Sequence, residues 1–225
     1  GSLDDVDPRD IDSGSLGDKF LIGPLTCFCK MGTALKSILI IANESWGVFG
    51  FCFMMNLGYT YVIVDDWLPC DQKGQPLFSY NKSKRIWLGL LEKAYAKLHS
   101  CYQHIHGGFE PYAVSDCLGS ANLPVRVIAK PDLNEPENLK LWKMLISRLR
   151  SNSVMTTSIN PKALKDTKEV ITALGLRVGY AYFINRIAEG DGFKIIQLFN
   201  PLGTDGWTGK WYEDDPLWKD KSQLK

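Results

Sequence analysis

The chain has 225 residues, of which 45% are hydrophobic and 23% charged, a composition typical of globular domains that excludes intrinsic disorder and a disulfide-stapled miniprotein. Lys and Arg number 26 against 25 Asp and Glu, so the sequence has no basic excess for a phosphate backbone and argues against nucleic-acid binding. No apolar run is long enough to span a bilayer, which predicts a protein without a transmembrane segment.

The first half of the chain is predicted to combine two helices with a pair of strands. Residues 15–30 are largely apolar and predict a buried helix that Pro24 kinks or delays. Aromatic and β-branched residues predict strands over 47–53 and 59–64. Apolar side chains at three- and four-residue steps then predict a long helix over 84–105.

The second half is predicted to contain one helix followed by strands. The helix is expected over 136–150, with Pro136 in its first turn. Strand-like runs follow at 154–159, 179–187 and 193–199. The turn at 190–192 joins the last two as a hairpin. Helices before strands predict an α+β fold of two lobes, the first over 1–116 and the second over 117–225.

Two clusters have the residue types of metal sites, but their spacing favours other roles. His99, Cys101, His104 and His106 suggest zinc, yet His99 and His104 are five residues apart and do not share a helix face. The preferred interpretation is a polar helix end that runs into a glycine pair. The acidic start of the chain lacks the turn glycine and the closing glutamate of an EF-hand loop at their required offsets.

The cysteines and the N-terminal sequence predict the cellular compartment. The six cysteines include no C-x-x-C pair, and the acidic start does not have the basic and apolar regions of a secretory signal. These features predict reduced thiols in a cytoplasmic protein. The leading Gly1-Ser2 resembles the remnant of a cleaved tag, so we expect the natural protein to extend further upstream.

Five segments follow the pattern of one family in the same order. The clearest is the predicted helix Trp-Leu-Gly-Leu-Leu-Glu-Lys-Ala-Tyr-Ala-Lys-Leu at 87–98. The others are Asp10–Phe20, Val62–Pro69, Gly179–Tyr182, and Asn200–Gly203 with Trp-Thr-Gly-Lys-Trp at 207–211. Together they resemble the calpain protease core, the calcium-dependent branch of the papain-like cysteine peptidases. The resemblance implies a papain-like α+β core in calpain form, with a helical N-terminal lobe packed on a β-rich C-terminal lobe.

The resemblance also implies positions for the catalytic groups. Such peptidases use a cysteine nucleophile, a histidine base, an asparagine that orients the histidine, and a glutamine amide that holds the oxyanion. In this sequence the cysteine position is Lys19, the histidine position is Tyr180 and the glutamine position is Ser13. Asn200 is kept, but the tryptophan beside it is replaced by Leu202. The resemblance therefore implies a degenerate catalytic site.

Lys19 and Tyr180 do not form a replacement catalytic pair. Attack by a lysine on a peptide carbonyl would leave a stable amide, and a phenol with an ordinary pKa near ~10 is a poor base. We expect Lys19 to fill the cleft and to hydrogen-bond to the oxygen of Tyr180 or of a nearby Asp. An active peptidase would instead need Cys27 or Cys29, which lie at least eight residues past the nucleophile position.

The family's core binds one calcium ion in each lobe, so the resemblance implies candidate calcium ligands. In the first lobe the side-chain ligands correspond to Asp10 and Glu92, with backbone carbonyls from the N-terminal loop. The alternatives are a solvated turn residue for Asp10 and a surface position for Glu92. In the second lobe the corresponding positions are Gly206, which offers no side-chain oxygen, and Glu213. We expect that second site to be absent.

We therefore predict a proteolytically inactive calpain-like domain that acts as a protein-binding or scaffold module. Family members that lack the triad are known, and several associate with the cytoskeleton, which suggests protein partners of that class and a cytoplasmic, cytoskeleton-associated location. Two alternatives belong to other classes of function. One is a calcium-dependent calpain-type cysteine endopeptidase, and the other is a calcium-sensing module without catalysis.

Overall fold

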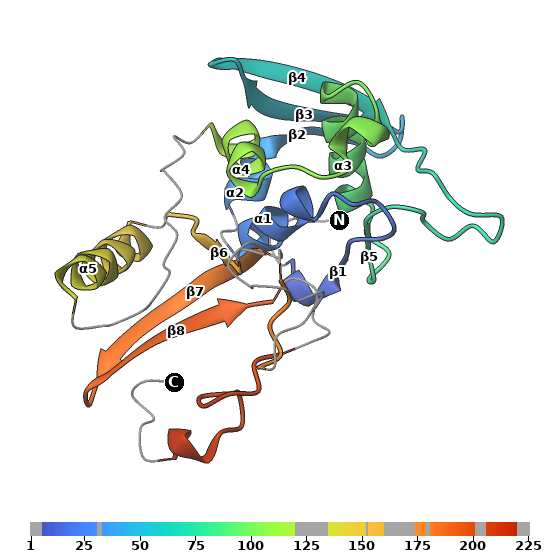
Figure 1. Cartoon of the computed structure of the whole chain (residues 1–225). Helices are drawn as coiled ribbons and strands as arrows, with labels where there is room; N and C mark the ends of the chain where they lie inside the picture. The colour runs from blue at the N-terminus through green and yellow to red at the C-terminus, as the bar shows by residue number, and fades with distance from the viewer. Residues whose placement is uncertain are drawn as a thin grey trace. The chain divides into compact units, whose positions relative to one another are not determined.

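A computed structural model describes residues 6–30, 33–119, 135–151, 153–159, 174–178, 181–200 and 206–219 (Figure 1). The chain divides into two compact units, Gly1–Leu123 and Pro124–Lys225. Each unit contains helix and antiparallel sheet, so the predicted α+β class is confirmed. Among the described residues no helix combines the length and the apolar character that a membrane crossing requires.

The first unit is built around α1 (Lys19–Lys30), in which every residue from 21 to 29 is buried. The predicted helix is confirmed, although it begins at Lys19 rather than at Ser15. Pro24 lies inside α1, where it removes one backbone hydrogen bond without ending the helix. Burial on all sides of a helix indicates that it lies at the centre of its unit.

Several short elements complete the first unit beside the longer helices. They are η1 (Pro8–Asp10), β1 (Ile11–Asp12), α2 (Thr33–Ile38), β5 (Tyr80–Asn81) and η2 (Tyr102–Ile105). β1 pairs antiparallel with β5, so the segment before α1 lies beside the segment that leads into the next long helix. This pairing places Asp10 next to the turn that follows Asn81.

A three-stranded antiparallel sheet forms the other layer of the first unit, in the order β2-β3-β4. Its strands are β2 (Leu39–Asn43), β3 (Val48–Met55) and β4 (Gly58–Asp65). The strands predicted over 47–53 and 59–64 are β3 and β4. Asn56 and Leu57 join them with φ angles of 50° and 64°, a two-residue turn whose twist matches that of the strands.

The helix α3 (Trp87–Leu98) packs against the inner face of this sheet. It is shorter than the predicted helix over 84–105, because Ser100 has a φ of 83° that an α-helix does not allow. The chain continues as η2 instead. The ring of Tyr95 meets that of Phe53 edge-on, with centroids 5.8 Å apart, and fills the space between helix and sheet.

A second helix on this face, α4 (Glu110–Leu118), was not predicted from the sequence. It ends at Gly119, whose φ of 62° is the left-handed conformation common after helices. The hydroxyl of Tyr95 donates to Asp116 Oδ2 at 2.7 Å and so connects α3 to α4. Burial raises the pKa of Tyr95 further, so this phenol stays protonated as a donor. The predicted lobe boundary after residue 116 lies within α4.

The second unit contains one helix, a three-stranded sheet and a short 3₁₀ helix within its described residues. These are α5 (Pro136–Arg150), β6 (Thr156–Ser158), β7 (Ala181–Gly190), β8 (Phe193–Phe199) and η4 (Pro216–Trp218). The predicted helix over 136–150 is confirmed at both ends. Asp191 and Gly192 form the predicted hairpin turn, with φ angles of 50° and 78°. Trp142 Nε1 donates to Glu189 Oε2 at 2.8 Å and fixes α5 to β7.

Candidate functional site

Lys19, at the implied nucleophile position, is the first residue of α1 and is half-buried. The backbone N–H groups of Leu21 and Ile22 donate to the carbonyl of Asp18 at 2.8 and 3.2 Å, which begins the helix. The side chain of Asp18 is completely buried. A carboxylate suits the positive end of the helix dipole, whereas an ammonium group does not. Lys19 therefore lies where the helix favours a negative charge.

Asp18 is paired with Glu92, which comes from the middle of α3 and is 1% exposed. Glu92 accepts hydrogen bonds from the backbone N–H of Ser79, at 3.0 and 3.3 Å. Among the described residues, no N–H or hydroxyl group donates a hydrogen bond to either carboxylate oxygen of Asp18. Two carboxylates cannot donate to each other, so Asp18 gains a partner only when Glu92 keeps its proton.

The electrostatics of this pair favour a single shared proton. Burial raises the pKa of Glu92 to about 9, and the negative charge of Asp18 adds to this effect. Burial also raises the pKa of Asp18, to about 6, although hydrogen bonding and the positive charge of Lys19 act in the opposite direction. Near neutral pH, Glu92 therefore holds the proton and Asp18 carries the negative charge.

The segment before α1 is held by the residues that follow η2. Gly17 donates its N–H to His106 Nδ1 at 3.3 Å, and Gly107 donates to the Gly17 carbonyl at 2.9 Å. A Cβ atom at Gly17 would lie 2.7 Å from the His106 ring, so a larger residue does not fit there. The three histidines have separate partners, since His104 Nδ1 contacts the His99 carbonyl at 2.9 Å and His99 Nε2 lies 3.6 Å from Asp116.

The cysteines of α1 are placed as packing residues. Cys27 and Cys29 are both buried, and their thiols donate to the carbonyls of Gly23 and Leu25 at 3.4 and 3.2 Å. Burial raises the pKa of the Cys29 thiol to about 12. Because the thiolate is the nucleophilic form, Cys29 does not have the charge that a catalytic cysteine needs, and neither position has the exposure.

Asp10, the first candidate calcium ligand, closes the turn between β5 and α3. Its carboxylate accepts from Asn81 Nδ2 at 3.1 Å, from Ser83 Oγ at 2.6 Å and from the Ser83 backbone N–H at 2.5 Å. An open hollow of about 350 Å³ beside it is lined by Asp7, Arg9, Asp10, Lys82, Ser83 and Arg85. The surroundings of Asp10 are thus rich in cationic side chains.

The two candidate ligands do not fit a calcium ion as they are arranged. Asp10 is occupied by neutral donors, whereas Glu92 accepts from the Ser79 N–H and its pKa is raised by burial and by the charge of Asp18. The described residues contain no group of three or more His, Cys, Asp or Glu side chains that could hold a metal ion. The alternative interpretation of Glu92 as a surface position is wrong, because the side chain is buried. Calcium binding here remains a prediction.

The remaining predicted site residues are spread over both units. Ser13 follows β1 in the first unit and is half-buried. Asn200 follows β8 in the second unit, and Gly206 and Glu213 lie near its end. Tyr180 and Leu202, together with the N-terminal loop that would supply calcium-binding carbonyls, lie outside the described residues. The expected contact between Lys19 and Tyr180 therefore remains a prediction.

Sequence reasoning missed the pair formed by Asp18 and Glu92. A signal for it was present, since Glu92 lies four residues after Leu88 and three before Tyr95, so these two apolar side chains lie on the same side of the predicted helix as Glu92. An acidic residue at such a position must be neutralised or paired. The sequence alone did not identify the partner, because Asp18 is 74 residues away.

Comparison with known proteins identifies the family of this chain. The family model described as calpain family cysteine protease matches residues 2–225. The calpain-type cysteine protease DEK1 of Arabidopsis thaliana is 26% identical over 98% of this chain and 10% of its own length. Calpain-5 of Caenorhabditis elegans is 28% identical over 98% of this chain and 38% of its own length. The Calpain-2 catalytic subunit of Homo sapiens is 30% identical over 93% of this chain and 30% of its own length. This chain thus spans well under half the length of these relatives. Because the family model covers almost every residue, the chain belongs to the calpain family of cysteine proteases.

Proposed function

We propose that this chain is a proteolytically inactive calpain core that acts as a protein-binding or scaffold module. The observation that carries the proposal is Lys19, which starts α1 where the family resemblance places the nucleophile. A lysine that attacked a peptide carbonyl would form an amide, and this product would block further turnover. Its ammonium group also lies close enough to Asp18 to influence the charge of that carboxylate, which suits a structural role.

The other cysteines of α1 support the same proposal. Cys27 and Cys29 are buried, and each thiol donates to a carbonyl of its own helix. To act as a nucleophile, either residue would need to lose its proton and reach a substrate from inside the core. The base position and the oxyanion position, Tyr180 and Ser13, also lack the groups that acyl transfer requires.

A peptidase assay tests the proposal directly. The chain is incubated with casein and with a fluorogenic calpain peptide, in calcium and in chelator, beside an active calpain core as positive control. We expect no turnover above buffer. Cys27→Ser and Cys29→Ser serve as controls for the alternative nucleophiles. Turnover that either substitution abolishes would overturn the proposal in favour of a peptidase with a displaced catalytic thiol.

We also propose that the partners are proteins, including cytoskeletal ones, and that binding in the cytoplasm uses surfaces outside the former catalytic cleft. This part rests on analogy with family members that lack the triad. Lys19 fills the place of the reacting carbonyl and would obstruct a peptide in the cleft. The exposed Lys140 and Lys143 of α5 provide a basic surface for acidic filaments.

Co-sedimentation with actin filaments and with microtubules tests the partner class. We expect Lys19→Ala to leave binding unchanged, and Lys140→Glu combined with Lys143→Glu to weaken it, most strongly at low salt. Loss of binding in Lys19→Ala, with full binding in the charge-reversed variant, would move the binding surface into the cleft. Absence of binding to either filament would contradict the cytoskeletal part of the proposal.

A further inference from the structure

The outward side of β4 is apolar. Tyr59, Tyr61 and Ile63 are 71%, 65% and 54% exposed. The valines that alternate with them, Val62 and Val64, are buried. This alternation shows that one face of the strand meets the core and the other is open. Outward positions of a half-buried antiparallel strand are normally polar, so three large apolar side chains in a row are unusual.

The same face continues across the sheet. Ile63 pairs with Gly50, and Gly50 pairs with Ile41, while Tyr61 pairs with Cys52. A Cβ atom at Gly50 would lie 3.0 Å from the Ile41 side chain, so Ile41 covers the glycine and extends the apolar surface. We call Ile41, Gly50, Cys52, Tyr59, Tyr61 and Ile63 the outer sheet face.

No described helix packs on the outer sheet face. The helices in contact with the sheet are α2, α3 and α4, and Figure 1 shows them together on one side of it. The three strands contain a single charged residue, Asp65, at the end of β4. Within the part of the chain that the structure describes, the face therefore has neither a covering element nor the charged side chains that keep exposed sheets apart in solution.

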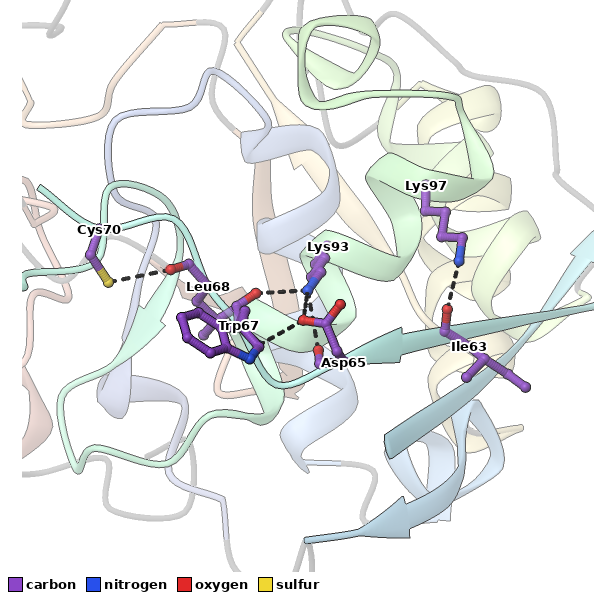
Figure 2. Close-up of polar contacts among 7 residues, drawn as sticks. All are labelled: Ile63, Asp65, Trp67, Leu68, Cys70, Lys93 and Lys97. Atoms are coloured by element: carbon purple, nitrogen blue, oxygen red, sulfur yellow. Dashed lines mark hydrogen bonds and ion pairs between the residues drawn. The ribbon is translucent and has the colours of Figure 1, made fainter. Parts of the chain in front are cut away.

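The free edge of β4 is closed by two lysines of α3, as Figure 2 shows. Lys97 Nζ donates to the Ile63 carbonyl at 2.9 Å. Lys93 Nζ donates to the carbonyls of Asp65 and Trp67 at 3.2 and 2.7 Å, and binds Asp65 Oδ1 at 2.6 Å. An added strand would have to displace these ammonium groups, so association along this edge is disfavoured. A partner would use the face instead.

The exposed apolar area is large enough for a stable interface. Trp46 and Trp67, 80% and 82% exposed, flank one end of the outer sheet face, and Leu57, fully exposed, flanks the other. Aromatic side chains bury about 150–250 Å² each, so the four exposed rings of Tyr and Trp alone present on the order of 600 Å². With the aliphatic residues the total approaches the ~800 Å² that each partner contributes to a standard interface.

The distribution of charge indicates how a second copy would be oriented. Glu44 and Asp66 are exposed near one end of the sheet, where Lys93 pairs with Asp65, whereas the β3–β4 turn at the other end has no charged residue. A two-fold axis that reverses the strands places the acidic end of one copy against the uncharged end of the other. The parallel alternative would bring the acidic ends together, which is unfavourable.

We propose that the outer sheet face is a homodimer interface, on which a second copy of this chain packs with its strands reversed. The contact is isologous, so each copy buries the same residues and the dimer is closed. Two sheets packed in this way form a sandwich with an apolar centre. The inference does not depend on loss of proteolysis, but a dimer would present any partner-binding surface twice and so increase avidity.

Sedimentation velocity of the 225-residue chain over a range from micromolar to several hundred micromolar tests the proposal. We expect a concentration-dependent monomer–dimer equilibrium. Tyr61→Lys with Ile63→Lys should raise the dissociation constant by at least about tenfold, as loss of central interface residues usually does. Tyr61→Thr keeps a strand-forming residue and should also raise the dissociation constant. It replaces the double variant in the test if the double variant fails to fold.

Tyr112→Lys is the matched control, because Tyr112 is also 65% exposed but lies on α4. Tyr61→Phe, which keeps the ring, should also dimerise like the parent. Circular dichroism and melting temperature verify that each variant is folded. A chain that stays monomeric at every concentration overturns the proposal. The assignment of the face is overturned if the folded double variant or the folded Tyr61→Thr variant still dimerises like the parent. It is also overturned if Tyr112→Lys weakens the dimer equally.

Discussion

Two regions of the first unit depart from the usual distribution of polar and apolar side chains, and they do so in opposite directions. At the start of α1, Asp18 and Glu92 are buried among apolar residues. On the outer sheet face, Tyr59, Tyr61 and Ile63 are exposed to water. Buried carboxyl groups must be neutralised inside the molecule, so their effect appears in stability and its dependence on pH. Exposed apolar groups cost the monomer little, so their effect appears in association.

The largest expected effect tests whether the start of α1 can still support catalysis. Lys19→Cys with Tyr180→His restores the nucleophile and the base, but leaves Ser13 at the oxyanion position and Leu202 beside Asn200. Loss of one oxyanion donor typically lowers kcat by about 10²–10³. We expect the double variant to hydrolyse a calpain peptide at least about 100-fold more slowly than an active calpain core.

Addition of Ser13→Gln to this double variant is the matched comparison. An increase in rate on that third substitution would assign the defect to the oxyanion position. A double variant as fast as the active core would show instead that the surroundings of the site still support catalysis, and would contradict this prediction.

The next prediction separates the two members of the buried pair. Glu92→Leu removes the acceptor of the Ser79 N–H and the donor to Asp18, which leaves two buried polar groups without partners. Each such loss typically costs about 1–3 kcal/mol, so we expect the free energy of unfolding to fall by about 3 kcal/mol. Urea unfolding followed by circular dichroism measures it.

Glu92→Gln is the control, because its amide nitrogen donates to Asp18 and its carbonyl accepts from Ser79. We expect this variant to be at least as stable as the parent at neutral pH. Equal destabilisation by Glu92→Leu and Glu92→Gln would mean that the pair does not share a proton.

The pH dependence of stability follows from the same pair. The pKa values of Asp18 and Glu92 are raised to about 6 and about 9, whereas unfolded carboxyl groups titrate near pH ~4. Between these limits the folded chain binds more protons than the unfolded chain, so the pair's stabilising contribution is full below pH ~4 and is lost as the pH rises. Between pH 6 and 9 we expect a loss on the order of 1 kcal/mol per pH unit.

Urea unfolding at several pH values checks this slope, with Glu92→Gln as control. The substitution removes the titrating group of the higher pKa, so the slope above pH 6 should become flatter. A parent chain whose stability rises over that range, or an unchanged slope in the variant, would contradict the protonation of Glu92.

Calcium binding provides a smaller test of the buried pair. An ion at Asp10 and Glu92 would have to displace the Ser83 donors from one carboxylate and the proton from the other. We therefore expect calorimetric titration to detect at most one weak site, with a dissociation constant of about 10⁻⁴–10⁻³ M. Asp10→Ala or Glu92→Ala should abolish it. Two sites, or one that neither substitution affects, would contradict this assignment.

The smallest expected effect concerns the outer sheet face. Tyr61→Thr removes an exposed ring from an edge strand and keeps a residue that favours strands, so it should change the free energy of unfolding by no more than about 0.5 kcal/mol. The measurement is made at a protein concentration where the chain is monomeric. A loss comparable to that of Glu92→Leu would show that Tyr61 belongs to the core, and the contrast between the two regions would disappear.

Local sequence was a good guide wherever neighbouring residues decide the structure. The helix over 136–150 was predicted with its observed ends, because Pro136 starts it and apolar residues recur along one side. The hairpin turn at 190–192 was predicted from a Gly-Asp-Gly sequence that tolerates positive φ angles. The helix over 84–105 was too long, because the break at Ser100 is not marked by a glycine or proline.

The sequence by itself determined the family, the α+β class and the residues at the positions that the family resemblance assigns to catalysis. These properties follow from the order of residues along the chain, and the resemblance assigns the nucleophile position to Lys19 whatever its surroundings. Only the tertiary structure decided that Glu92 is buried against Asp18, that Asp10 binds Ser83, and that no described element covers Tyr61. Each of these three findings depends on which segments meet in space. The burial and the pKa of a side chain are set by the groups around it, and the residue type alone does not fix them.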